Sequence, residues 1–132
     1  MTIERFGSDN PWEATVGYCR AVRAGDYVHV AGTTATVDGQ VVGIGDAAEQ
    51  TRVALGIIAA ALERADATLA EVVRTRLFVT DITNWETVGR AHGEVFAAIR
   101  PAATMVEVSA LIDPDHLVEI EVDAFAPRDR RA

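Results

Sequence analysis

The chain has 132 residues, of which 49% are apolar and 24% charged, a composition typical of a soluble globular protein. We therefore treat residues 1–132 as one domain, with an irregular lead-in at 1–15 and a short tail at 127–132. The net charge of −8 disfavours binding to nucleic acid, because such binding depends on basic side chains that neutralise phosphates. Cys19 is the only cysteine, and the sequence has neither a signal-peptide core nor an apolar run of about 18 residues. These features predict a cytoplasmic protein that does not enter a membrane.

Alternating apolar residues predict a β-hairpin early in the chain. Its strands span about 16–23 and 26–32, and Gly25 in the connection suits a positive φ. A third short strand is expected at 40–42, within a glycine-rich stretch.

Two amphipathic helices are predicted, each with a capping signal at its start. Asp46 and Glu49 form a capping box that begins a helix over about 46–64. Thr83, again with a glutamate three residues later, begins a second helix over about 83–99.

Further strands are predicted at 72–80, 102–111 and 117–126. The order of elements predicts an α+β fold, in which one mixed sheet carries two helices packed on one face. Side chains alternate between the faces of a strand, so the apolar residues of two strands should face the helices. These residues are Val73, Thr75, Leu77 and Val79 on one strand, and Val118, Ile120, Val122, Ala124 and Ala126 on the other.

The other face of the sheet is predicted to be charged. If this face is open to water, its ion pairs contribute about 0–1 kcal/mol each. If it is buried against other subunits in a closed ring, an unpaired carboxylate costs several kcal/mol. Because an uncovered face that still bears Val, Met and Phe favours association, we predict a closed ring and not a monomer. The residues concerned are Glu107, Glu119, Glu121 and Asp123, with Arg74, Arg76 and Phe78.

Three segments together resemble a known family. They are GYCRAVRAGDYVHVAGTTA, LFVTDITNWETV and RPAATMVEVSALIDPDHLVEIEVDAFAP. Over about residues 16–127 the pattern resembles the Rid family of RidA/YjgF-like reactive intermediate deaminases. The resemblance implies a chorismate-mutase-like fold, assembled as a homotrimer with small-molecule clefts between subunits. It also implies hydrolysis of reactive imines or enamines to keto acids and ammonia.

The resemblance assigns a site residue by residue. Glu119 matches the glutamate that holds the attacking water, while Tyr18 and Gly32 match residues that line the cleft. Ala103 occupies the place of an arginine that grips the substrate carboxylate as a bidentate fork. Losing such a contact removes roughly 1.5–3 kcal/mol, which predicts a less anionic substrate. The positions beside it, where the family commonly has Ser and Cys, are Thr104 and Met105.

Several of these residues also have a purely structural interpretation. Glu119 could pair with Arg74 or Arg76 across the sheet, and Thr104 is a good strand former in any case. Arg100 is a poor substitute for the missing arginine, because an odd spacing from Ala103 places the two side chains on opposite faces of a regular strand. We interpret Arg100 as a helix-end residue.

No metal and no cofactor is predicted, because the three histidines are scattered and no ligand spacing occurs. The sequence favours a Rid-type C=N hydrolase, an imine or enamine deaminase with an altered substrate range. The alternatives are a non-catalytic trimeric protein that binds a small metabolite and a chaperone-like stress protein.

Overall fold

A computed structural model describes residues 2–131 of the chain. It contains a six-stranded sheet in the order β1-β2-β3-β8-β6-β7, with β6 and β7 parallel and the other pairs antiparallel. A separate hairpin joins β4 to β5. The strands are β1 (Ile3–Phe6), β2 (Ala21–Ala24), β3 (Tyr27–Thr33), β4 (Thr36–Val37), β5 (Gln40–Val41), β6 (Val72–Val79), β7 (Ala102–Glu107) and β8 (Val118–Phe125).

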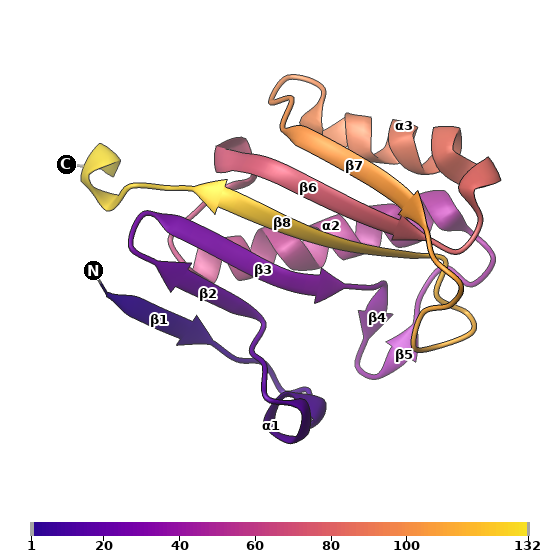
Figure 1. Cartoon of the computed structure of the whole chain (residues 1–132), viewed down its shortest axis with the longest axis horizontal. Coiled ribbons are helices and arrows are strands. Elements are labelled where there is room, and N and C mark those ends of the chain that lie inside the picture. The colour runs from indigo at the N-terminus through magenta and orange to yellow at the C-terminus, as the bar shows by residue number, and fades with distance from the viewer. Residues whose placement is uncertain (1, 132) are drawn as a thin grey trace.

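Two long helices, α2 (Ala47–Arg64) and α3 (Trp85–Phe96), lie behind the sheet in Figure 1 and leave its front face bare. This confirms the predicted mixed α+β sheet with helices on one face. The apolar residues of β8 are almost fully buried against the helices, as their alternation predicts. No helix in residues 2–131 is long and apolar enough to cross a bilayer.

The N-terminal segment differs from the prediction. The supposedly irregular lead-in contains β1 and a short helix, α1 (Trp12–Val16), and the hairpin strand predicted from residue 16 begins only at Ala21. Gly17 explains the difference, because it adopts φ 92° and ends α1 with a hydrogen bond from its N–H to the Glu13 carbonyl oxygen. At the other end, a 3₁₀ turn spans Arg128–Arg131. Met1 and Ala132 lie outside the described residues.

The two helix starts were predicted with different success. The Asp46 carboxylate accepts a hydrogen bond from the Glu49 N–H (3.0 Å), as expected of an N-cap. Thr83 does not begin α3. Asp81 instead accepts bonds from the N–H and hydroxyl of Thr83 and caps a 3₁₀ turn (Ile82–Asn84) that leads into the helix.

Two β-bulges shift the strand register, and neither is evident from the sequence. Between Val72 and Arg74, β6 has one residue more than β8, so Val72 faces the core while Val73 is 46% exposed. The assignment of Val73 to the helix-covered face was therefore wrong. The second bulge is in β3. Val30 and Thr33 both face the core, although regular alternation would place residues three positions apart on opposite faces.

A buried glutamine fixes the loop that enters β8. The Gln50 side chain is fully buried, and its amide nitrogen donates to the carbonyl oxygens of Gly43 (3.1 Å) and Asp115 (2.9 Å). Its amide oxygen accepts from the Leu117 N–H (2.8 Å). These bonds hold the chain just before Val118, where β8 begins.

Candidate functional site

The bare face of the sheet carries the predicted charged rows. In the register between β6 and β8, Arg76 lies opposite Glu121 and Phe78 lies opposite Glu119. Arg76 Nη1 is 3.1 Å from Asp123 Oδ2 and 3.5 Å from Glu121 Oε1. His29 Nδ1 is 2.7 Å from Asp123 Oδ1. Two of the three carboxylates of β8 on this face are therefore neutralised within the chain.

Glu107 was predicted on the same face, and this was wrong. It pairs laterally with Val79 of β6, whose side chain is buried under the helices, so Glu107 projects to the helix side at the sheet edge. Its carboxylate accepts a hydrogen bond from the Ile82 N–H at 3.0 Å. Glu107 is thus a structural residue bound to a backbone donor.

Glu119 is the unpaired carboxylate of the bare face. It is half-buried, and within residues 2–131 it makes no side-chain hydrogen bond or ion pair. Neither predicted arginine partner reaches it, since Arg74 donates to Thr104 Oγ1 (3.3 Å) and Arg76 binds the other two carboxylates. The ion-pair interpretation of Glu119 is therefore not supported within one chain.

Gly32 lies directly beneath the Glu119 carboxylate. A Cβ on Gly32 would lie 3.0 Å from Glu119 Cδ and closer still to Oε2, so only glycine leaves the carboxylate its present position. Gly32 belongs to the β3 bulge, between Val30 and Thr33. The predicted pair of Gly32 and Glu119 is thus brought together by two neighbouring strands.

Arg20 contacts the same glycine through its carbonyl oxygen, and the sequence prediction missed this residue. Its Nη2 donates to the Gly32 carbonyl oxygen at 2.6 Å. Its Nε is buried with no hydrogen-bond partner, and its Nη1 makes no hydrogen bond among the described residues. No Arg20 nitrogen lies within 4.0 Å of a Glu119 carboxylate oxygen. The only sequence signal was its position two residues after Tyr18.

Tyr18 lies in the segment between α1 and β2. It is half-buried, and its hydroxyl accepts a hydrogen bond from Asn10 Nδ2 at 3.2 Å. No hydrogen bond joins it to Gly32 or Glu119 in the described part of the chain.

The remaining predicted site residues lie on the edge strand β7, separated from β3 by β8 and β6. Ala103 pairs with Thr75 and is exposed at the helix side of the edge. Thr104 lies on the bare face, where it accepts the hydrogen bond from Arg74, and Met105 packs against the core. One chain therefore does not bring Ala103 to Glu119, because they lie on different faces and two strand spacings apart, roughly 10 Å.

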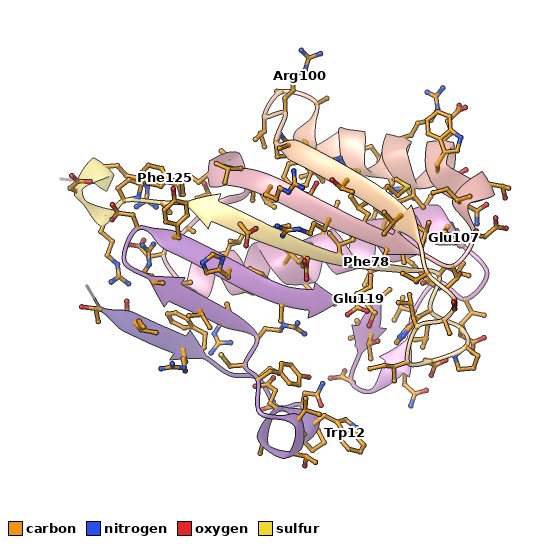
Figure 2. The ribbon with its side chains drawn as sticks, in the orientation of Figure 1. Trp12, Phe78, Arg100, Glu107, Glu119 and Phe125 are labelled. Atoms are coloured by element: carbon orange, nitrogen blue, oxygen red, sulfur yellow. The ribbon has the colours of Figure 1, made fainter. Side chains whose placement is uncertain are left out.

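Arg100 does not replace the missing arginine. Figure 2 shows it at the outer edge of the sheet, directed away from Glu119. Its φ is 58°, and its N–H donates to the Phe96 carbonyl oxygen at 2.8 Å, so it ends α3 in a left-handed conformation. The interpretation of Arg100 as a helix-end residue is consistent with this geometry.

At the candidate site, the half-buried Glu119 carboxylate has no cationic partner among residues 2–131. It lies over Gly32, whose carbonyl oxygen accepts a hydrogen bond from the Arg20 guanidinium. A carboxylate in such a position can orient a water molecule and accept its proton. Within residues 2–131, no three His, Cys, Asp or Glu side chains converge as a metal site would require.

Comparison with known proteins identifies the family of the chain. The sequence profile of the family described as endoribonuclease L-PSP matches residues 8–126. A protein of Acinetobacter baylyi named 3-aminoacrylate deaminase RutC is 35% identical over 104 residues, which cover 78% of this chain and 82% of the relative.

Solved structures give the same result. Rv2704 of Mycobacterium tuberculosis, described as a member of the YjgF/YER057c/UK114 family, is 51% identical with a TM-score of 0.86, covering 95% of this chain and 100% of that one. YyfA of Yersinia pestis, described as a conserved Rid family protein, is 32% identical with a TM-score of 0.84 and coverage of 95% and 100%. The predicted resemblance is confirmed: the chain belongs to the Rid/YjgF family, the family whose profile carries the name endoribonuclease L-PSP.

Proposed function

We propose that this protein is a C=N hydrolase that converts a small imine or enamine into a carbonyl compound and ammonia. The observation that carries the proposal is the Glu119 carboxylate, which lies over Gly32 and forms no ion pair with any cation among residues 2–131. The 35% identity to a protein named as a 3-aminoacrylate deaminase supports the same chemistry, because 3-aminoacrylate is an enamine.

The proposed reaction has two steps. Glu119 orients a water molecule and accepts a proton as the water oxygen attacks the carbon of the protonated imine, giving a carbinolamine. The proton then passes from Glu119 to the amine nitrogen. As the C–N bond breaks, the hydroxyl proton of the carbinolamine passes to Glu119 and the carbonyl forms. Glu119 then gives this proton to the departing ammonia, which leaves as ammonium. An enamine first gains a proton at carbon and then follows the same course.

The proposed working form is a homotrimer located in the cytoplasm. The predicted site residues fall into two groups on one chain, with Gly32 and Glu119 on the bare face and Ala103 at the edge of β7. A cleft between two subunits would let one group face the other. Exposed apolar residues on the bare face, such as Val106, support such an association.

Ribonuclease activity, which the name of the family profile suggests, finds no support in the charge of this chain. The net charge of −8 would repel an RNA backbone. We therefore propose a small-molecule substrate.

The test uses imines generated in solution by an amino-acid oxidase and trapped as semicarbazones. The wild type should reduce the yield of semicarbazone by removing the imine first. Glu119→Gln should lower kcat/KM by about 100-fold or more, the range for loss of a general base. Glu107→Gln is the matched control, since Glu107 lies on the other face and binds only a backbone N–H. Absence of activity on acidic, neutral and basic imines would contradict the proposal and favour a binding protein.

A further inference from the structure

We propose that Arg20 is the residue that binds the anionic group of the substrate, in compensation for the arginine absent at Ala103. The inference rests on the proposed function, since it concerns the same site, and it changes the expected substrate. The missing arginine by itself predicts a less anionic compound. An arginine beside Gly32 restores a place for a carboxylate.

The first argument is position. Arg20 donates to the carbonyl oxygen of Gly32, and the Glu119 carboxylate lies over the Cα of the same residue. Gly32 thus contacts both the Arg20 guanidinium and the Glu119 carboxylate, and these two charged groups form no ion pair with each other. A ligand bound next to Gly32 would therefore lie near both the guanidinium and the proposed water-holding carboxylate.

The second argument is the state of the guanidinium. An arginine side chain has five N–H donors, and Arg20 uses one group, Nη2, on Gly32. Its Nε is buried without an acceptor, which is uncommon in folded proteins and leaves this guanidinium less satisfied than a purely structural arginine would be. Nη1 has no partner either and is not among the buried atoms, so a ligand can reach it.

The third argument is pre-organisation. The bond of 2.6 Å to Gly32 fixes the direction of the guanidinium plane before any ligand arrives. A planar fork held in this way suits two parallel hydrogen bonds to a carboxylate. Arg20 and Glu119 both contact the single residue Gly32, which suits a small compound that carries its carboxylate close to its C=N group. The inferred ligand class is therefore a small imine or enamine that carries a carboxylate.

A structural role for Arg20 gives a different expectation. If Arg20 only holds the β3 bulge through Gly32, its removal would disturb Glu119 and slow all substrates equally. If Arg20 binds the substrate anion, its removal should slow the hydrolysis only of substrates that carry a carboxylate. The ratio of the two activities separates these roles.

The experiment compares a carboxylate-bearing imine, made by an amino-acid oxidase, with a neutral imine made by an amine oxidase. Arg20→Gln should lower kcat/KM at least tenfold for the first, through KM, and less than twofold for the second. Arg20→Lys, which keeps the charge but loses the fork, should fall between the wild type and Arg20→Gln. Arg90→Gln is the matched control, because Arg90 is exposed on α3 and pairs only with Glu86. Equal losses for both imines, or no loss, would overturn the proposal.

Binding of pyruvate, a simple keto acid, gives a second measurement that does not depend on turnover. Titration calorimetry should show binding to the wild type and to Glu119→Gln, and at least tenfold weaker binding to Arg20→Gln. If the wild type hydrolyses no imine but pyruvate binding still depends on Arg20, the hydrolase proposal fails and the anion site stands. If imines are hydrolysed while neither pyruvate binding nor the activity ratio responds to Arg20→Gln, only the anion site fails. A thermal melt and an elution volume equal to those of the wild type establish that each variant is folded.

Discussion

The carboxylate of Glu119 occupies the space that a side chain on Gly32 would fill. The two residues belong to different strands, and the glycine lies in the only stretch of β3 where the register with β8 changes. Neither residue alone makes the site, because the position of the carboxylate depends on the missing Cβ.

Gly32→Ala should therefore reduce activity far more than stability. The new Cβ meets the flexible end of the Glu119 side chain, which can rotate away at small cost in the free energy of unfolding. The displaced carboxylate would no longer orient water, so we expect kcat/KM to fall at least tenfold with a melting temperature within a few degrees of wild type. Gly56→Ala in α2, where a Cβ meets nothing within 4 Å, is the control and should keep full activity. Loss of folding in the first variant alone would refute this account.

Ala103→Arg, introduced into the Arg20→Gln variant that lacks the inferred anion site, should increase hydrolysis of imines that carry a carboxylate. Ala103 is exposed at the edge of β7, so a long side chain can be accommodated there. A bidentate contact is worth roughly 1.5–3 kcal/mol, which corresponds to an increase in kcat/KM of about 10- to 100-fold. Ala60→Arg, at an exposed position of α2, adds the same charge elsewhere and should have no effect. An unchanged rate would mean that Ala103 does not face the cleft.

Gln50→Leu should destabilise the protein strongly. The change keeps the buried volume but removes three hydrogen bonds and leaves the Leu117 N–H and two carbonyl oxygens without their partner. We expect the free energy of unfolding to fall by about 3–5 kcal/mol in urea denaturation. Gln40→Leu, at an exposed position in β5, should change it by less than about 0.5 kcal/mol.

Burial of His92 predicts a pH dependence. Its Nε2 lies 3.0 Å from Thr75 Oγ1, and burial lowers the pKa of the imidazole below its usual 6.5. The unfolded chain therefore binds a proton near pH 6.5 that the folded chain does not, so His92 makes the protein less stable as the pH falls through this value. The effect levels off once the pH is below the pKa of the folded state.

The measurement is urea unfolding of the wild type and His92→Gln between pH 5 and pH 8. The stability of the wild type relative to the variant should be constant above about pH 7.5 and should decrease as the pH falls through about 6.5. Carboxylates act equally in both proteins and cancel in this difference. Parallel stability curves would show that the pKa of His92 is the same in the folded and unfolded chains.

Association can be tested on the bare face. Val106 is 42% exposed and lies beside Phe78, so an aspartate there would place a charge in the proposed interface. Light scattering should give the wild type a mass of three times 14.1 kDa and Val106→Asp the mass of one chain. Val37→Asp, which is as exposed but lies in the β4–β5 hairpin, should remain associated. A wild-type mass of one chain would end the proposal of a shared cleft.

Local sequence patterns predicted the fold well, because each reflects interactions between residues that are close in the sequence. The Asp46 cap and the apolar alternation of β8 depend on neighbouring residues, and both are present in the structure. The bulges in β3 and β6 depend on pairing with a strand far away in the sequence, so regular alternation placed Val73 on the wrong face. Glu107 was misplaced for the same reason, since only its register with β6 shows its face.

For the candidate site, the sequence supplied the identity of some residues but not their arrangement in space. The resemblance supplied Gly32 and Glu119, and the structure places them in contact. Arg20 was missed because its hydrogen bond depends on where the β3 bulge turns the Gly32 carbonyl. No local pattern in the sequence encodes that direction.

The last strand of the sequence, β8, lies between β3 and β6 near the middle of the sheet. Until it leaves the ribosome, the strands on either side have no partner across the gap, and the surface that seats α2 is incomplete. Synthesis must therefore proceed through Phe125 before the sheet can be completed. A premature stop codon before Val118 would do more than shorten one end, because it would remove β8 and leave two half-sheets with exposed edges, a species prone to aggregate and to be degraded.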